Sequence, residues 1–215
     1  MPPRNRKPHT ITRRHGKKDP KISIYAFCEG RKTEPYYLKQ FNKLHGNGMV
    51  KLDSTAPAGV PMTVVKNAVA KRKSLQKIAR KNSDPLDALF EVWALFDCDE
   101  HPLVNDAIAL ASGNGVFVGY SNPCFEIWAM LHYRNQTAHV HRHNLQRELS
   151  ELHPQYNNRE AKLICPIELK DNYEIAKSRA LSLEREHERV NTPKANPYTN
   201  VYELLDKIVE NGKAG

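Results

Sequence analysis

Acidic side chains stand at the ends of three apolar, strand-like runs of this sequence. Glu29 directly follows ISIYAFC, Asp97 and Asp99 follow LFEVWALF, and Glu126 lies shortly after a third such run. Two carboxylates ~4 Å apart repel by about 4 kcal/mol at an effective dielectric of ~20, so a cluster of them calls for a neutralising cation. Carboxylate oxygens suit Mg²⁺ or Mn²⁺, and a metal held in this way polarises phosphoryl oxygens and activates water. In Asp97-x-Asp99, alternate residues of an extended chain point the same way and can reach one ion.

These acids can meet only if the apolar runs pair in one sheet, and the order of the predicted elements favours that arrangement. Ligands of open parallel sheets bind beyond the carboxyl ends of the strands, which is where all three acidic runs fall. Alternation of strands and helices predicts an α/β fold with a mostly parallel central sheet flanked by helices. The strands are predicted over 22–28, 49–54, 89–96 and 115–119, and the helices over 34–44, 63–81, 102–112 and 125–134.

The last third of the chain has a different pattern. Helices are predicted over 145–152, 173–190 and 201–210, and the segment 153–170, with its prolines, is predicted to form loops or short turns. We therefore divide the chain into a disordered basic arm at 1–20, an α/β core at 21–135 and a C-terminal helical part at 136–215 packed on the core.

Positive charge is concentrated in two segments. The chain has 33 Lys and Arg against 24 Asp and Glu, a formal charge of +9, and residues 1–20 supply seven Lys or Arg against one acid, or +6 of that total. This arm has too few aliphatic residues to form a core, and it either contacts phosphates or serves as a solubilising tail. The predicted helix 63–81 lies in a stretch with no acid between Asp53 and Asp84. Ordinary solvated faces mix both signs, so this helix favours an anionic partner, with nucleic acid the commonest.

Basic and polar residues near the acids are candidates for holding a phosphate-bearing substrate. Two of them directly follow the Glu29–Gly30 turn, and the turn after the fourth strand can present backbone N–H groups to a phosphate. The predicted substrate-binding residues are Arg31, Lys32, Lys71, Arg72, Lys73, Ser121 and Asn122.

Other candidates have simpler structural explanations. Thr33 is expected to cap the helix that follows it, and Glu34 in the first turn suits the helix dipole better than a catalytic role. His139, His141 and His143 alternate as zinc ligands on a strand would, but no cysteine accompanies them, and a basic patch that gains charge at low pH fits better.

Four motifs together resemble the RloB-like family over about residues 20–210. They are C-E-G-x-x-T-E at 28–34, F-D-C-D-E at 96–100, S-N-P-C-F-E-I-W at 121–128 and N-P-Y-T-N-V at 196–201. RloB-like proteins in turn resemble Toprim domains, whose signature is a glutamate after the first strand and a later D-x-D. The combination of motifs is specific, whereas each motif alone is common.

The resemblance implies a Toprim-like core with Mg²⁺-dependent chemistry on phosphodiesters. It implies that Glu29 is the general acid/base or a metal ligand, that Asp97 and Asp99 are the metal-binding pair, and that Glu126 is an added acid of this branch. The family is associated with bacterial restriction and anti-phage loci, often beside an ATPase, and related Toprim effectors are toxic nucleases, some acting on tRNA. No G-x-x-x-x-G-K-[ST] occurs in this chain, so an ATPase would be a separate protein.

The resulting expectation is a metal-dependent nuclease that cleaves nucleic acid as the effector of an anti-phage system, with RNA and tRNA among the candidate substrates. The alternative is a catalytically inactive Toprim-like subunit that binds nucleic acid or regulates a partner ATPase. A nucleotidyl transferase or primase is disfavoured because the chain is too short for template-handling domains. The sequence does not decide whether the substrate is DNA or RNA. It also leaves the oligomeric state open, including a homo-oligomer.

Composition also bears on the compartment. The longest apolar runs are about six residues, far short of the ~18 needed for a membrane span, and the first 20 residues lack the apolar region of a signal peptide. The four cysteines form no C-x-x-C pair. We therefore expect a reduced, cytoplasmic protein without membrane contact.

Overall fold

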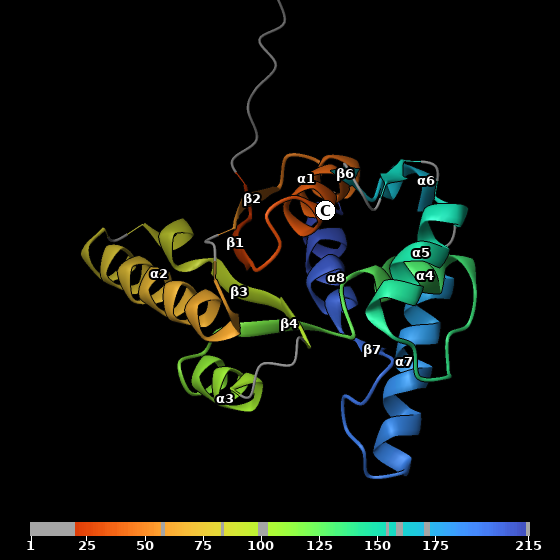
Figure 1. The fold of residues 1–215 in the computed structure, drawn as a ribbon. Helices are drawn as coiled ribbons and strands as arrows, with labels where there is room; N and C mark the ends of the chain where they lie inside the picture. Colours follow the sequence, from red (N-terminus) through yellow and green to blue (C-terminus); the bar gives the residue numbers. More distant parts are fainter. Residues whose placement is uncertain are drawn as a thin grey trace, which may run out of the picture.

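The computed structural model describes residues 20–56, 59–82, 84–98, 103–153, 155–157, 161–169 and 173–213. The arm predicted at 1–20 lies outside the described residues except for Pro20, and Asp99 and Glu100 lie outside them as well. The described chain forms a central sheet with helices on both faces (Figure 1), so the predicted α/β class is confirmed.

The central sheet has five strands in the order β2-β1-β3-β4-β7. Its first four strands in sequence run parallel, with Cys28 opposite Leu95 between β1 and β3 and Asp97 opposite Ser121 between β3 and β4. The fifth strand is antiparallel to β4 and was not predicted, because two residues carry no periodicity. The strands are β1 (Ile22–Cys28), β2 (Val50–Thr55), β3 (Phe90–Asp97), β4 (Phe117–Asn122) and β7 (Tyr198–Thr199).

Two hydrophobic cores lie on opposite faces of this sheet. Side chains of β1 alternate between them: Ile24, Ala26 and Cys28 face one core, and Tyr25 and Phe27 pack against the other. The first core is covered by α1 (Thr33–His45), α4 (Glu126–Tyr133), α5 (Arg142–Leu152), α7 (Tyr173–Arg189) and α8 (Val201–Gly212). The second is covered by α2 (Pro61–Lys81) and α3 (Val104–Gly113).

Shorter elements complete the chain. They are the 3-10 turn η1 (Pro85–Ala88), the two-stranded sheet of β5 (Tyr156–Asn157) and β6 (Ala161–Lys162), and α6 (Pro166–Leu169). The segment 136–213 supplies β7 to the main sheet and apolar side chains to the same core as α1 and α4. The predicted boundary at 135/136 stays a prediction.

Helix α1 begins at Thr33, one residue earlier than predicted. Lys32 occupies the N-cap position without a side-chain cap hydrogen bond, and Thr33 is the first helical residue, so the predicted cap at Thr33 is wrong. In the first turn of α1, the carboxylate of Glu34 accepts a hydrogen bond from the N–H of Gly30, two residues before the N-cap, at 3.1 Å. This places Glu34 at the sheet edge rather than on the helix surface.

Two asparagines of the N-P-Y-T-N motif explain why that motif precedes α8. Asn196 exchanges two hydrogen bonds with the backbone of Val140, at 3.0 and 2.9 Å. Asn200 does the same on β4: its Oδ1 accepts from the N–H of Tyr120 at 2.7 Å, and its Nδ2 donates to the carbonyl of Val118 at 2.9 Å. The motif therefore ties the C-terminal segment to the sheet.

The structure has neither a membrane-spanning helix nor a disulfide among the residues described. No helix in those ranges is long and apolar enough to cross a bilayer. Cys28, Cys98, Cys124 and Cys165 are all free thiols, and three of them are buried.

Substitution of Gly212 by Ala is expected to destabilise the protein by about 1–3 kcal/mol, the usual cost of overpacking. Gly212 ends α8 against the end of α1, and a Cβ there would overlap the backbone carbonyl of His45, which cannot move as a side chain can. Urea unfolding of the variant measures the loss. Gly113→Ala is the matched control, because a Cβ at this helical position meets nothing within 4 Å. Equal stability of the two variants would contradict the prediction.

His132 is expected to make stability fall as the pH drops from about 6.5 towards 4. The ring is buried against Trp128, and burial lowers the pKa of His132 from 6.5 to about 4. Between these values the unfolded chain binds a proton that the folded chain excludes, so stability is present above pH 6.5 and is lost below it. Between pH 7 and 5 the loss amounts to about 2 kcal/mol.

The pH effect is checked by a double difference. Urea unfolding is measured at pH 7 and pH 5 for the wild type and for His132→Gln, whose amide can still donate to the carbonyl of Leu169, which the ring Nδ1 contacts at 3.0 Å. The other titrating groups cancel between the two proteins. Parallel losses in both proteins would refute the assignment to His132.

Candidate functional site

Glu29 and Asp97 meet at the carboxyl edge of the sheet, as their positions after β1 and at the end of β3 predict. The N–H of Glu29 donates to the carbonyl of Leu95 at 2.9 Å, which extends the β1–β3 ladder by one residue. The side chain of Glu29 then turns back, and its Oε2 accepts from the N–H of Asp97 at 3.2 Å. Glu29 is thereby fixed beside Asp97 by the strand pairing itself.

Glu34 joins this edge from the first turn of α1. Its side chain is 4% exposed, and a Cβ on Gly30 would overlap its carboxylate, so glycine at position 30 leaves the space in which Glu34 lies. Burial, together with the nearby charges of Glu126 and Glu29, raises the pKa of Glu34 from 4.5 to about 7. The helix-start position of Glu34 predicts a structural role, and the structure adds this carboxylate to the acidic group.

Glu126 approaches the same edge from the first turn of α4 and is held by hydrogen bonds. The carboxylate is 4% exposed, and its Oε1 accepts from the hydroxyl of Tyr156 at 2.5 Å and from Nε2 of Gln146 at 3.2 Å. Lys162 reaches the Oε1 of that glutamine at 3.4 Å. A hydrogen-bonded carboxylate of this kind has a fixed position rather than a mobile one.

The electrostatics of Asp97 show that the four carboxylates act on one another. Burial raises the pKa of Asp97 well above its usual range, and the charges of Glu34, Glu126 and Glu29 raise it further, in that order. The guanidinium of Arg142, at the start of α5, acts in the opposite direction. The edge therefore carries an excess of negative charge, which a bound cation would relieve.

Sequence reasoning missed four residues of this group: Glu34 as a member of it, and Arg142, Gln146 and Tyr156. Glu34 could have been found from the sequence, because it belongs to the same E-G-x-x-T-E motif as Glu29 and follows Gly30 by four residues. The other three come from α5 and β5, more than 40 residues after β3, and no motif marks them. Only the packing of α5 and β5 against α4 brings them near the acids.

The predicted substrate-binding residues are distributed over several places. Arg31 and Lys32 are exposed in the turn after Glu29, next to the acidic group. Ser121 is 1% exposed, with its hydroxyl 3.1 Å from that of Thr199. The side-chain amide of Asn122 donates to the carbonyl of Lys194 at 3.0 Å.

The basic residues of α2 are not gathered at the acidic edge. The ammonium of Lys71 lies 4.3 Å from the centre of the Tyr25 ring, in the middle of β1. Arg72 extends over Phe90, the first residue of β3, at the opposite edge of the sheet from Asp97. Lys73 is exposed on the outer face of the helix.

The chemistry of the acidic group fits a divalent cation, although its ligand set is not complete among the described residues. Within those ranges no group of three or more His, Cys, Asp or Glu side chains is placed to hold a metal ion, and this applies equally to the alternating histidines. Asp99, the expected partner of Asp97, is not described. The donors present are carboxylate oxygens, and burial together with the neighbouring carboxylates raises the pKa of Glu34 and of Asp97. Carboxylate oxygens are the ligand type that Mg²⁺ and Mn²⁺ select.

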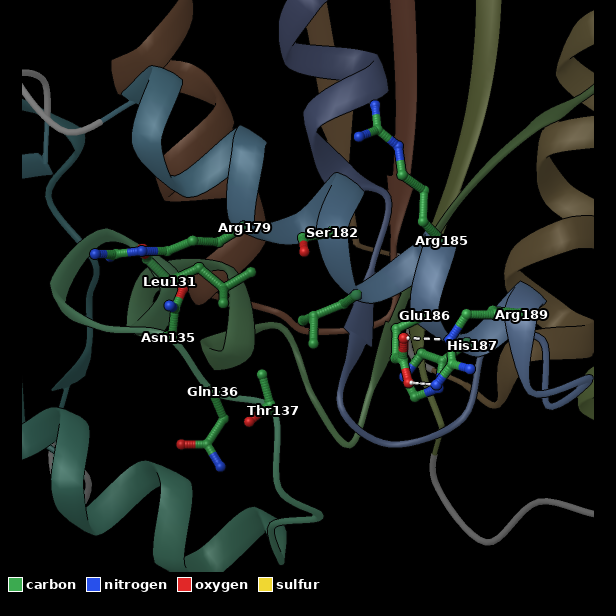
Figure 2. Close-up of a pocket in the computed structure, with 11 residues that line it drawn as sticks. Leu131, Asn135, Gln136, Thr137, Arg179, Ser182, Arg185, Glu186, His187 and Arg189 are labelled. Atoms are coloured by element: carbon green, nitrogen blue, oxygen red, sulfur yellow. Dashed lines mark hydrogen bonds and ion pairs between the residues drawn. The ribbon is translucent and has the colours of Figure 1, made fainter.

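A separate cavity of about 520 Å³ lies at the other end of α4, between α7 and the loop that follows α4. Figure 2 shows Asn135 and Thr137 on the loop, with Arg179 and Ser182 on α7. None of the predicted site residues lines this cavity, and its carboxylate, Glu186, forms an ion pair with Arg189 at 2.6 Å. The cavity therefore contributes nothing to the acidic group.

Fold and site together define an α/β protein with a group of carboxylates at the carboxyl edge of a mostly parallel sheet. The sequence model of one family, described as RloB-like protein, matches residues 24–208. The match covers most of the chain, which therefore belongs to the RloB-like family, as the four motifs indicate. Comparison with curated proteins and with solved structures found no match in either.

Proposed function

We propose that this protein is a metal-dependent nuclease with a Toprim-like site that cleaves nucleic-acid phosphodiesters as the cytoplasmic effector of a bacterial anti-phage system. The observation that carries the proposal is the contact between Glu29 and Asp97, with Glu34 and Glu126 acting on the same charge. Carboxylates with a raised pKa, gathered where parallel sheets bind ligands, are typical of catalytic sites. RNA, and tRNA in particular, is the substrate that the family resemblance favours.

In this proposal Glu29, Asp97 and Asp99, together with Glu126, hold Mg²⁺ or Mn²⁺. When bound, such an ion polarises a phosphoryl oxygen and lowers the pKa of its bound water. The backbone of β3 keeps Glu29 in place through the Asp97 N–H. Because the pKa of Glu34 is raised to about 7, this carboxylate is only partly charged near neutral pH, which limits the negative charge of the edge before substrate binds. The positive charge of Arg142 acts on Asp97 by lowering its pKa, and guanidinium groups bind phosphate oxygens in a planar, two-pronged geometry.

Purified protein incubated with labelled RNA and DNA tests the proposal. We expect cleavage of at least one substrate with Mg²⁺ or Mn²⁺ and none with EDTA. The products would be analysed for 5′- and 3′-phosphates, which also distinguishes an endonuclease from an exonuclease. Cleavage that persists with EDTA would refute a metal-dependent reaction, and its absence on every substrate with either metal would favour the second candidate below.

The second candidate is a catalytically inactive subunit that binds nucleic acid or regulates a separate ATPase. It is favoured by one observation: Glu126, a predicted metal ligand, already accepts two hydrogen bonds through Oε1. Phage plating separates the two candidates when the protein is expressed with its neighbouring genes. Loss of protection in an Asp99→Asn strain supports the nuclease, and unchanged protection supports the inactive subunit.

A further inference from the structure

The outer face of α2 carries a single row of positive charges. Five exposed basic side chains recur at intervals of seven, four, three and one residues, which places them within about 100° of one another around a helix of 3.6 residues per turn. We call this row the α2 basic stripe; it consists of Lys66, Lys73, Lys77, Arg80 and Lys81. At 1.5 Å per residue the α2 basic stripe is about 22 Å long.

Among the residues that the structure describes, no acid forms an ion pair with the α2 basic stripe. Helix α2 itself contains no Asp or Glu. Lys73, Lys77 and Lys81 are four residues apart, and like charges at this spacing weaken a helix. A row of charges that opposes its own helix is better explained by an anionic partner than by solubility alone, since mixed charges would give solubility without that cost.

The position of the stripe relates it to the acidic group. Helix α2 follows β2, whose last residue, Thr55, pairs with Phe27 near the carboxyl edge of the sheet. The helix then runs back along the face of the sheet, because Lys71 lies over Tyr25 and Arg72 over Phe90. Figure 1 shows α2 on the side of the sheet away from α8. The stripe thus begins towards the acidic edge at Lys66 and leads away from it to Lys81.

Lys71 and Arg72 do not belong to this surface. Their cationic groups lie over the Tyr25 and Phe90 rings, and a Cβ on Gly115 would contact the Arg72 guanidinium at 2.8 Å. These two side chains fasten α2 to the sheet. Lys73, by contrast, points outward, so the basic residues of α2 divide into an anchoring pair and an exposed row.

We propose that the α2 basic stripe binds the sugar–phosphate backbone of the nucleic-acid substrate at a distance from the cleavage site. This inference rests on the proposed nuclease function and specifies the substrate further. A row of cations about 22 Å long matches about seven base pairs at ~3.4 Å each. The substrate is therefore a nucleic acid with a duplex segment longer than that, gripped along α2 while a phosphodiester lies at the acidic edge.

Binding is measured by fluorescence anisotropy with a labelled 24-base-pair RNA duplex and the DNA duplex of the same sequence. EDTA is present, so that cleavage does not interfere. The test variant is Lys73→Glu/Lys77→Glu. The matched control is Lys39→Glu/Lys43→Glu, which makes the same charge change at two exposed lysines, also four residues apart, on α1. A six-base-pair hairpin serves as the short probe.

We expect the stripe variant to weaken binding of a 24-base-pair duplex at least about tenfold near 0.1 M salt, and to make the slope of log K against log salt less negative by about 2. The control is expected to change binding by no more than about twofold, since charges beyond the ~10 Å Debye length are screened. The short hairpin is expected to bind both variants alike. Equal losses for the two variants, or stripe-dependent binding of anionic vesicles but of neither duplex, would overturn the proposal.

Cleavage assays on the same preparations keep the two proposals apart. If the stripe variant alone loses duplex binding but no protein cleaves, the nuclease function fails and the binding surface stands. If the wild type cleaves with metal and the stripe variant binds like the control, the binding surface is refuted and the nuclease function stands.

Discussion

Asp97→Asn is expected to lower the rate of metal-dependent cleavage by about 10²–10⁴-fold, the range found when an essential acid–base or charge-stabilising group is removed. Asparagine has the size of aspartate but not its charge, so the proposed ion loses a ligand at the point where Glu29 and Asp97 meet. The backbone N–H that holds Glu29 is unchanged by the substitution. Glu29→Gln is expected to have a similar effect, because its amide oxygen can still accept that hydrogen bond while its charge is lost.

Stability measurements distinguish this loss from unfolding. Asp97 lies among carboxylates that raise its pKa, so removing its charge in the absence of metal is expected to leave the melting temperature unchanged or to raise it. Asp106→Asn is the matched control, since Asp106 is exposed on α3 and away from the acidic group. Full activity of Asp97→Asn, or loss of activity in Asp106→Asn as well, would remove the assignment of Asp97 to the reaction.

The fold was predictable where a local pattern determines an element. The run LFEVWALF is too short for a buried helix and is bounded by Pro85 and Asp97, and in the structure β3 is buried on both faces from Val92 to Phe96. Strand β7 was not predictable in this way. It consists of two residues, and it is positioned by Asn200 and by pairing with β4, which are contacts between residues about 80 positions apart.

The acidic site was predictable only in part, for a related reason. Alternating strands and helices predict a parallel sheet, and the carboxyl ends of parallel strands lie at one edge. The meeting of Glu29 and Asp97 follows from that arrangement. The direction of a side chain does not follow from that alternation. Lys71 and Lys73 are two residues apart in one basic run, yet one lies over Tyr25 and the other is exposed, because helical geometry turns them by 200° relative to each other. Arg142 and Tyr156 reach the site through tertiary packing alone.

Tertiary packing also explains the two motifs that contain asparagine and proline, S-N-P-C-F-E-I-W and N-P-Y-T-N-V. S-N-P-C-F-E-I-W is expected to offer backbone amides to a phosphate, which stays a prediction. The structure adds a second role for its side chains: Ser121 contacts Thr199 of the other motif, and Asn122 donates to the carbonyl of Lys194 just before that motif. The two segments therefore support each other across β4 and β7. Their residue types are suited to this role, since amide side chains can satisfy a donor and an acceptor at once.

Asn200→Ala is expected to lower the free energy of unfolding by roughly 2–6 kcal/mol, at about 1–3 kcal/mol for each buried polar group left unpaired. Strand β7 pairs with only two residues of β4, Ser121 and Asn122. The side-chain amide of Asn200 extends this pairing, because it accepts from the N–H of Tyr120 and donates to the carbonyl of Val118 as a neighbouring strand would. Alanine provides neither partner, and the hydrogen bond from Tyr120 is buried while the one to Val118 is partly buried. Urea unfolding followed by circular dichroism measures the change.

Two further variants show whether the paired amide is responsible. Asn200→Asp keeps the acceptor for Tyr120 but places an oxygen against the Val118 carbonyl, so it is expected to be destabilised about as much as the alanine variant. Asn211→Ala is the control, because Asn211 donates only to the carbonyl of Lys207 one turn back in its own helix, at 2.8 Å, and its loss is expected to cost less than about 1 kcal/mol. If Asn200→Ala were as stable as Asn211→Ala, the amide of Asn200 would not be what attaches the C-terminal segment to β4.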